Sequence, residues 1–361
     1  MKVYIKFLLS IFSKSLFYVI SIMFSLIFIL NLLTELEFFK EIEVGIAFPI
    51  LLSLLNSPSM IFEMLPFIFL ITTQLFFIKL FNNNEIEIFK YSGLKNSSIL
   101  RIYSVITLIT AIILTIIFYN FSATFKNFYL DKKTKFTTDA KYLAVITKNG
   151  LWIKDEIDEK IYIVNSSRIK DNFLINNFIT EFDQDYKVIR NLKSDKIDIQ
   201  NKEWKINDVT IYKRNNYDVQ KLLKIKTNFD YKRIQSLYSN LSSLTIFELF
   251  ELRKNYKKLN YSLTEINLQL LKICFYPLYL LLIAFFSSLI MFRIKRLHNT
   301  TFKISLGLFF SVIIYYINNF FMVMGSTERM SIIFAILTPL ILLTIVTVSY
   351  THLTLPTKDS V

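Results

Sequence analysis

Six long apolar stretches with almost no charge constrain this sequence more than any other feature. An α-helix needs about 20 apolar residues to cross the roughly 30 Å hydrocarbon core of a bilayer, and each stretch approaches that length. The sequence therefore predicts a polytopic α-helical membrane protein with six transmembrane helices. They form two groups of three, centred on 16–33, 61–80 and 102–121, and on 268–292, 304–324 and 332–348.

The distribution of Lys and Arg among the short connections predicts the orientation of these spans. Basic residues gather at the N-terminus and after the second and fourth spans, whereas the opposite connections are acidic or nearly uncharged. Since cytoplasmic loops are enriched in Lys and Arg, the N-terminus is expected to be cytoplasmic. The long polar stretch follows three spans and is expected on the other side. The basic residues are Lys2, Lys6, Lys14, Lys90, Lys95, Arg101, Arg293, Lys295, Arg296 and Lys303.

The polar stretch between the third and fourth spans has the pattern of an all-β domain. Asn149-Gly150 separates two short apolar segments, 144–148 and 151–154, and readily adopts the positive φ angles of a hairpin turn. Further short strands are expected, separated by Asn and Asp clusters that favour turns. This pattern indicates an antiparallel sandwich or jelly roll inserted between the two transmembrane halves. The further strands are expected at 160–164, 173–182, 186–189, 197–199 and 209–212.

These patterns predict the boundaries of the domains. An N-terminal transmembrane half over 1–122 precedes a β domain over 123–238. Helical periodicity returns over 239–267, which leads into a C-terminal transmembrane half over 268–347.

The rare residues exclude several kinds of chemistry. Five glycines are too scattered to form a Walker loop or a dinucleotide-binding GxGxxG turn. Two histidines and Cys274 cannot supply a His/Cys metal cluster, and Cys274 is expected to pack as a small hydrophobe. No catalytic residue, cofactor, metal site or nucleic-acid partner is therefore expected. The densest group of carboxylates is predicted to form the solvated rim of a hairpin and consists of Asp155, Glu156, Asp158 and Glu159.

The connection after the second span predicts a short helix over 84–93. Asn84 and Glu87 match a capping box, and Gly93 suits the left-handed position at a helix end. Ile86 and Phe89 lie on one side, so this helix needs something to dock against. Two interpretations follow: an interfacial helix on lipid headgroups, or a coupling helix that fits a groove on a cytoplasmic motor.

Three elements of the sequence together resemble one protein family. Asn84-Glu85, six further residues and Ser92-Gly93-Leu94 resemble the LptF/LptG permeases of the lipopolysaccharide exporter, which have an acidic residue and a Ser-Gly or Ala-Gly pair here. The segment from Gly150-Leu151-Trp152 to Ile161–Ile163 is similar to the opening of the family's periplasmic β-jellyroll, in its LptG form. Glu265, Lys272 and Pro277-Leu278 resemble the approach to its fourth span.

The resemblance covers nearly the whole chain and implies a transport subunit in the bacterial inner membrane, not an enzyme. In the family, LptF and LptG form a pair of permeases on a dimeric ATPase, LptB. They extract lipopolysaccharide and pass it to LptC-like and LptA-like periplasmic bridge proteins. The helix over 84–93 would then be the coupling helix. The residues expected to contact or shape the LptB groove are Glu85, Glu87, Phe89, Tyr91 and Gly93.

The resemblance also implies where the lipid would be contacted. Lys40, beyond the outer end of the first span, would meet a lipopolysaccharide phosphate or, equally, be an ordinary snorkelling lysine. Glu63 is a carboxylate at the start of the second span and is a functional candidate or a solvated end residue. The acyl-chain path through the jellyroll would be lined by Leu151, Ile153, Ile161 and Ile163.

Two other functions are compatible with parts of the pattern. An ABC-linked permease of the FtsX/MacB type would signal across the membrane without carrying lipid, but such chains place the large domain after one span. A membrane-bound lipid-modifying enzyme would need a phosphate site or metal cluster that is not visible here. Residues 348–361 do not resemble the family's basic tail and are treated as non-native, so no function is assigned to them.

Overall fold

A computed structural model describes most of the chain, in two compact units. The described residues are 3–42, 44–134, 136, 151–157, 159–170, 172–213, 216–231, 234, 240–258, 262–293 and 300–354. Met1–Lys126 and Thr264–Val361 form one unit, which we call the helical unit, and Asn127–Leu263 form the other, which we call the sheet unit. The predicted strand over 144–148 and the Asn149-Gly150 turn lie outside the described residues.

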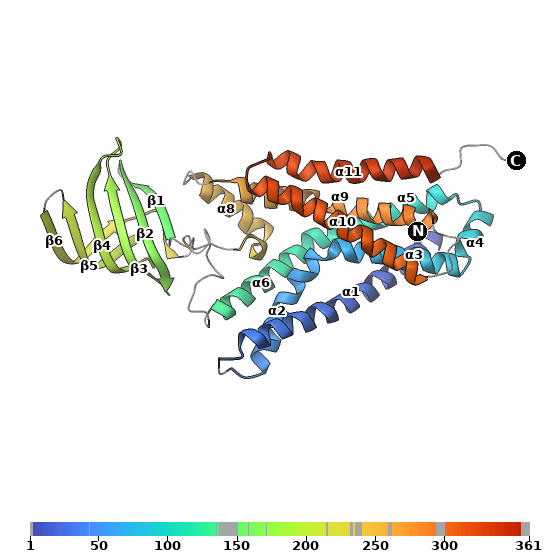
Figure 1. The fold of residues 1–361 in the computed structure, drawn as a ribbon, viewed down its shortest axis with the longest axis horizontal. Coiled ribbons are helices and arrows are strands. Elements are labelled where there is room, and N and C mark those ends of the chain that lie inside the picture. Colours follow the sequence, from blue (N-terminus) through green and yellow to red (C-terminus); the bar gives the residue numbers. More distant parts are fainter. Residues whose placement is uncertain are drawn as a thin grey trace. The chain divides into compact units, whose positions relative to one another are not determined.

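The helical unit consists of apolar helices that come from both ends of the chain (Figure 1). Within the described residues, five helices are long and apolar enough to cross a membrane, and two shorter apolar helices accompany them over Ala47–Glu63 and Ile332–Val348. Each predicted span falls on one of these helices, which confirms the mostly helical membrane fold. The helices are α1 (Val3–Phe38), α2 (Ala47–Glu63), α3 (Leu65–Asn82), α4 (Glu85–Tyr91), α5 (Asn96–Ile113), α6 (Tyr119–Thr134), α9 (Thr264–Arg293), α10 (Thr300–Ser326) and α11 (Ile332–Thr354), with a π-helical segment, η1 (Leu114–Phe118), between α5 and α6.

The helix α2 was not predicted, because the expected second span began only at 61. The α2 sequence contains two prolines and a Ser-Pro-Ser group, which interrupt its apolar pattern. In the structure α2 packs against α1 through polar side chains. The Asn31 amide donates to Ser57 Oγ (3.4 Å), and the Asn56 amide donates to Asn31 Oδ1 (3.3 Å). Since polar groups inside a bilayer need partners, these contacts hold α2 to α1.

The junction between α2 and α3 lacks one regular helical hydrogen bond. Pro66, in the first turn of α3, has no N–H to donate to the Phe62 carbonyl four residues earlier, and this carbonyl accepts from a backbone N–H at the cap of α2. The Tyr276 hydroxyl of α9 also donates to it (2.7 Å). The Phe62 ring also contacts the rings of Tyr276 and Tyr119, with centroids 4.9 and 5.1 Å away. Four helices, α2, α3, α6 and α9, therefore meet at Phe62.

An aromatic cluster forms the core of the helical unit around α3. Tyr103 of α5 is fully buried, and its ring lies 5.7 Å from Phe12, 4.8 Å from Phe76 and 5.4 Å from Phe77. Its hydroxyl shares a 2.6 Å hydrogen bond with Thr73. Such aromatic pairs add about 0.5–1.5 kcal/mol each beyond the area they bury. The cluster thus joins α1, α3 and α5.

A second polar contact joins α3 to α10. The Gln74 amide donates to the Lys303 carbonyl (2.8 Å), and all of the Gln74 side chain is buried. Gly307 leaves the room that this contact needs, because a Cβ atom there would collide with the Gln74 amide. The N-terminal half of α10 is therefore held close to α3.

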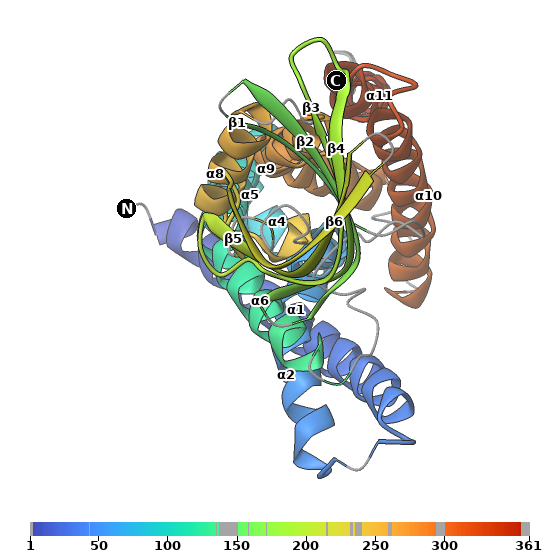
Figure 2. The ribbon, with the colours of Figure 1, turned by 90° about the vertical axis from the view of Figure 1, so that its left-hand side faces the viewer.

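The sheet unit is a six-stranded antiparallel sheet whose strands follow one another in sequence order (Figure 2). Figure 2 shows the sheet strongly curved. The same unit contains the short helix η2 (Leu241–Ser243) and the amphipathic helix α8 (Ile246–Lys258), which Thr245 and Glu248 cap. The strands are β1 (Leu151–Ile157), β2 (Lys160–Lys170), β3 (Phe173–Phe182), β4 (Val188–Asp198), β5 (Glu203–Lys213) and β6 (Asn216–Lys226).

The predicted β domain is confirmed, but its strands differ from the expected ones. The segments 186–189 and 197–199 belong to one continuous strand, β4, and 209–212 is the end of β5. The edge strand β6 was missed because its residues are almost all exposed and many are polar, so they show no apolar alternation. The described strands run as a meander, and the finer prediction of a jelly roll is not confirmed.

The curved sheet brings its two edges together. Asp155 of β1 accepts hydrogen bonds from Thr227 Oγ1 (2.7 Å) and from the backbone and side-chain amides of Asn228 (2.9 and 2.8 Å), just after β6. Trp204 Nε1 donates to the Phe229 carbonyl (2.8 Å), and both side chains are buried. The prediction of a solvated rim is therefore wrong for Asp155, which is only 3% exposed.

A buried carboxylate links β2, β3 and β4 in the same unit. Glu181 of β3 pairs with Lys160 Nζ (2.8 Å) and with the Arg190 guanidinium. Burial alone would raise the pKa of Glu181, but the hydrogen bonds and charges of Lys160 and Arg190 outweigh it, and the pKa is lowered. The hydrogen bond with Glu181 correspondingly raises the pKa of Lys160. The ionised pair therefore stabilises the folded sheet.

We predict that Glu181→Gln destabilises the sheet unit by about 1–2 kcal/mol at pH 7, less than the roughly 3–5 kcal/mol of a fully buried pair, because the Lys160 side chain is about half exposed. Because the pKa of Glu181 is lower in the folded state, its ionised form stabilises the fold at pH values above the unfolded pKa of about 4.3. This contribution disappears as the pH falls through the folded pKa. The variant should therefore lose less stability in acid than the parent. Both tryptophans, Trp152 and Trp204, lie in the sheet unit. Tryptophan fluorescence during unfolding of the full chain therefore measures the stability of the sheet unit.

Glu203→Gln is the matched control for this experiment. Glu203 pairs with Lys224 at 3.3 Å, but both side chains are about half exposed (50% and 53%). An exposed pair contributes little, so this variant should change the unfolding midpoint hardly at all. Equal effects of the two variants at pH 7 would contradict the stabilising role of Glu181.

Candidate functional site

The helix α4, on the connection between α3 and α5, is the first candidate site. Its C-terminal end has the predicted left-handed glycine, since Gly93 has φ +82°. The N–H groups of Gly93 and Leu94 donate to the carbonyls of Lys90 and Phe89 (both 2.9 Å), which is a Schellman motif. The predicted capping box is wrong, because the Asn84 side chain makes no cap and Asn84 itself is left-handed. Its carbonyl accepts from the Glu87 N–H instead (3.0 Å).

The apolar side of α4 docks on the chain's own helical unit. Ile86 is buried with 2% of its surface exposed, and the Phe89 ring packs edge to face against Phe7 of α1, with centroids 6.0 Å apart. The helix thus has the docking partner that its pattern required. The sequence predicts that Phe89 contacts or shapes the LptB groove; in the structure its ring packs against α1.

The opposite side of α4 is exposed and carries both apolar and acidic residues. Tyr91 is 90% exposed and Ile88 is 59% exposed, and Glu87 and Gly93 are also exposed. Glu85 is half-buried: its Oε1 accepts from the Asn83 amide (3.2 Å), whereas its buried Oε2 accepts no hydrogen bond from the described residues. Ile88 was not among the predicted residues, although its i, i+3 spacing to Tyr91 would have indicated it.

Lys40 lies at the end of α1, in the turn that follows Phe38. Its side chain is exposed, and its N–H donates to the Glu37 carbonyl (3.3 Å). Glu37 and Glu41 are also exposed beside it. The arrangement is compatible with both a phosphate contact and a snorkelling lysine. Glu63, at the end of α2, is paired with Lys126 of α6 (3.6 Å) and half exposed.

The sheet divides the four predicted acyl-path residues between its two faces. Cα partners on neighbouring strands share a face, and β1 pairs Ile153 with Val164 and Lys154 with Ile163. Leu151 and Ile153 therefore lie on one face, whereas Ile161 and Ile163 lie on the other. A shift of one residue changes the face of every side chain, and the apolar alternation of either strand alone does not determine the register between them.

The face with Leu151 and Ile153 forms the interior of the curved sheet. We call it the inner face, and seven of its apolar side chains are at most 4% exposed. On the other face, Trp152 and Phe178 are 53% and 44% exposed. The seven residues are Leu151, Ile153, Val164, Ile179, Leu192, Val209 and Ile211.

The inner face also contains a polar layer that is fully hydrogen-bonded. Ser166 Oγ donates to Asn177 Oδ1, and the Asn177 amide donates to the carbonyls of Leu174 (2.9 Å) and Ser194 (3.2 Å). Ser194 Oγ donates to the Asn207 carbonyl (2.6 Å). Asp155 and the ion pairs of Glu181 lie on the same face, on the other side of Ile153 and Val164. The surface suited to contact with hydrocarbon is therefore a band across the strands, between two polar rows. Among the residues that the structure describes, no three His, Cys, Asp or Glu side chains are placed to hold a metal ion.

Comparison with known proteins adds one finding. The family model described as lipopolysaccharide export system permease LptF/LptG matches residues 6–352. The match includes all the helices of the helical unit up to residue 352 and the whole sheet unit. No curated protein matches the chain.

Proposed function

The chain belongs to the LptF/LptG family of lipopolysaccharide export permeases, and from this premise we propose the part that it plays in export. It is the permease subunit of an ABC transporter that extracts lipopolysaccharide from the inner membrane and passes it to a periplasmic bridge. The observation that carries this proposal is the order of elements in a chain matched almost throughout: apolar helices, an inserted antiparallel sheet, then apolar helices. Within the family, Gly150-Leu151-Trp152 favours the LptG type.

The orientation that we propose has the N-terminus and α4 in the cytoplasm and the sheet unit in the periplasm. Lys90 lies in α4, and Lys95 and Arg101 follow it in the sequence, in agreement with the enrichment of basic residues in cytoplasmic loops. ATP hydrolysis then takes place in a separate chain, an LptB-type ATPase dimer. An LptF-type second permease completes the transmembrane cavity, and LptC-like and LptA-like proteins receive the lipid.

The exposed side of α4 is the proposed contact with the ATPase. Two neighbouring apolar side chains, Ile88 and Tyr91, protrude beside the carboxylates of Glu85 and Glu87. Such a surface fits a groove with an apolar floor and a basic rim that faces the carboxylates of Glu85 and Glu87. Closure of the ATPase dimer would then push α4, and the cavity between the two permeases would shrink around the lipid.

We predict that the double substitution Ile88→Ala and Tyr91→Ala reduces recovery of the ATPase with the tagged chain by about tenfold, as expected for a contact worth 1.4 kcal/mol or more. Glu85→Gln should weaken it by a smaller factor, because it removes only a negative charge that faces the basic rim. The measurement is the amount of ATPase that copurifies in mild detergent. Ile50→Ala, which truncates a side chain of α2 that is 42% exposed, is the control. Undiminished recovery with the double variant would show that α4 is not the docking helix.

The inner face of the sheet is the proposed path for the acyl chains. Its apolar residues lie side by side on neighbouring strands and are shielded from water by the curvature of the sheet. Lipid passage requires the two edges to separate, because the interior is closed by the contacts of Asp155 with Thr227 and Asn228. Ile161 and Ile163, on the other face, are thereby removed from the proposed path.

We predict that photocrosslinking residues placed at Ile153 and Val164 capture lipopolysaccharide while the exporter hydrolyses ATP. The same probe at Trp152 or Ile163, one position along the same strands, faces the other way and should capture about tenfold less. The measurement is the fraction of chain crosslinked to lipid, with and without ATP. Equal capture at all four positions, or capture only at Trp152 and Ile163, would overturn the assignment of the path.

A further inference from the structure

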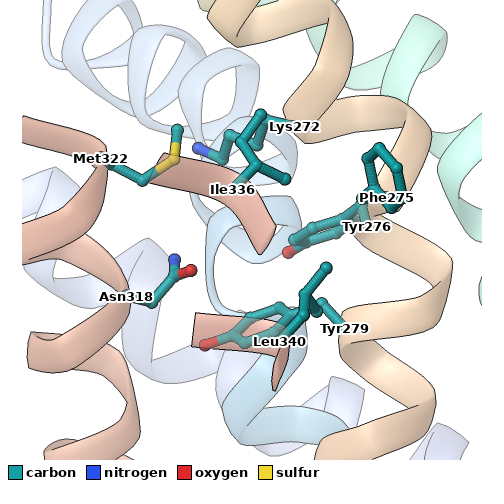
Figure 3. Close-up of a pocket in the computed structure, with 8 residues that line it drawn as sticks. All are labelled: Lys272, Phe275, Tyr276, Tyr279, Asn318, Met322, Ile336 and Leu340. Atoms are coloured by element: carbon teal, nitrogen blue, oxygen red, sulfur yellow. The ribbon is translucent and has the colours of Figure 1, made fainter. Parts of the chain in front are cut away.

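A pocket between α9, α10 and α11 has no part in the function proposed above. It contains about 350 Å³ of space not occupied by protein atoms, and because this volume includes open space outside the molecule, the pocket is a partly open one. Four polar side chains line it, Lys272, Tyr276 and Tyr279 from α9 and Asn318 from α10, together with apolar residues that include Met322 and Leu340. Figure 3 shows the polar ends of these four side chains directed into the space between the helices.

The polar groups of the pocket are mainly hydrogen-bond donors. The Tyr276 hydroxyl donates to the Phe62 carbonyl (2.7 Å), so its proton is already used. Among the described residues, Lys272, Tyr279 and Asn318 have no hydrogen-bond partner, and none of the side chains that line the pocket is a carboxylate. An ammonium, an amide and a phenolic hydroxyl that face one cavity are the donor set that binds an oxyanion.

The charge of the surroundings also favours an anion. Lys272 has no carboxylate within 4.0 Å among the described residues. Glu63 is the carboxylate that attracts the Lys272 ammonium. Its Oε1 also lies 3.6 Å from Lys126 Nζ, with which it forms an ion pair. Two ammonium groups thus share one carboxylate, which leaves one positive charge uncompensated beside the pocket. A cation in a region of low dielectric constant needs a counter-ion or water.

The place of the pocket along the membrane indicates the source of the anion. Lys272 lies eight residues, or about two turns, after the start of α9 at Thr264, on the side of the bundle where the sheet unit is inserted. That depth is near the boundary between hydrocarbon and headgroups, where lipid phosphates are found. The apolar part of the lining would then contact the carbons that adjoin a phosphate.

We propose that this pocket binds the phosphate of a membrane lipid. Lys272 forms the ion pair, Asn318 and Tyr279 donate to phosphate oxygens, and Met322 and Leu340 contact the adjoining lipid carbons. Every residue of the pocket belongs to this one chain. The site therefore does not depend on a second permease, on the ATPase or on the identity of the exported lipid, and it goes beyond the export path.

The test is a lipid titration of the purified full chain in mild detergent, followed by native mass spectrometry. Phosphatidylglycerol is the probe, and phosphatidylethanolamine, whose phosphate is already paired with its own ammonium group, should bind more weakly. Lys272→Gln should weaken the tightest phosphatidylglycerol binding by about tenfold, because it removes a charge-assisted contact. Tyr279→Phe, which removes only a hydroxyl, should weaken it by a smaller factor. Lys132→Gln removes a charge from an exposed position on α6 and is the matched control.

The outcomes separate this proposal from its rivals. Weakening by the Lys272 and Tyr279 variants, with the control unchanged, supports the pocket. Equal binding by parent and variants overturns it, as does equal weakening by Lys132→Gln, which would indicate a general effect of charge. Displacement of the lipid by inorganic phosphate at equal concentration would show a site for free anions and would contradict the lipid source. Recovery of the ATPase is measured on the same samples, so failure here leaves the export proposal separately testable.

Discussion

The helical unit depends on a hydrogen bond between helices from its two halves. Pro66 cannot donate to the Phe62 carbonyl, which accepts from the cap of α2 and, across the bundle, from the Tyr276 hydroxyl of α9. This bond joins the N-terminal and C-terminal halves of the chain at the point where α2 ends and α3 begins. The same tyrosine lines the pocket with Lys272, so the contact that closes the helix junction also shapes the proposed phosphate site.

The helix α3 connects this junction to the surface that we propose binds the ATPase. It is almost entirely buried, with Tyr103 of α5 bonded to Thr73 and the Lys303 carbonyl of α10 bonded to Gln74, and α4 follows its last residue, Asn82, after two residues. A helix of 18 residues is about 27 Å long. A displacement of α4 would therefore act on a rigid, well-packed helix that contacts the other half of the transmembrane unit, which is the mechanical connection that the export proposal requires.

Elements with strong local signals could be predicted from the sequence, and those fixed by distant contacts could not. The apolar spans, β3 and the glycine end of α4 follow from hydropathy, alternation and backbone conformation. The helix α2 depends on Asn31 of another helix, and β6 is held by its pairing with β5 instead of by an apolar face. Asp155 looked solvated because its partners lie 72 and 73 residues away. The pocket could not be predicted for the same reason, since it combines residues from three helices that are distant in the sequence.

The central claim is that the chain exports lipopolysaccharide as one permease of an ABC transporter. The most direct measurement is purification of the tagged chain from its native membrane in mild detergent, with identification of both the copurifying proteins and the bound lipid. The account predicts a cytoplasmic ATPase, a second permease of the same family and molecules of the lipid A type. Recovery of the ATPase without such lipid would indicate a permease that signals instead of transporting, and recovery of neither would contradict the account.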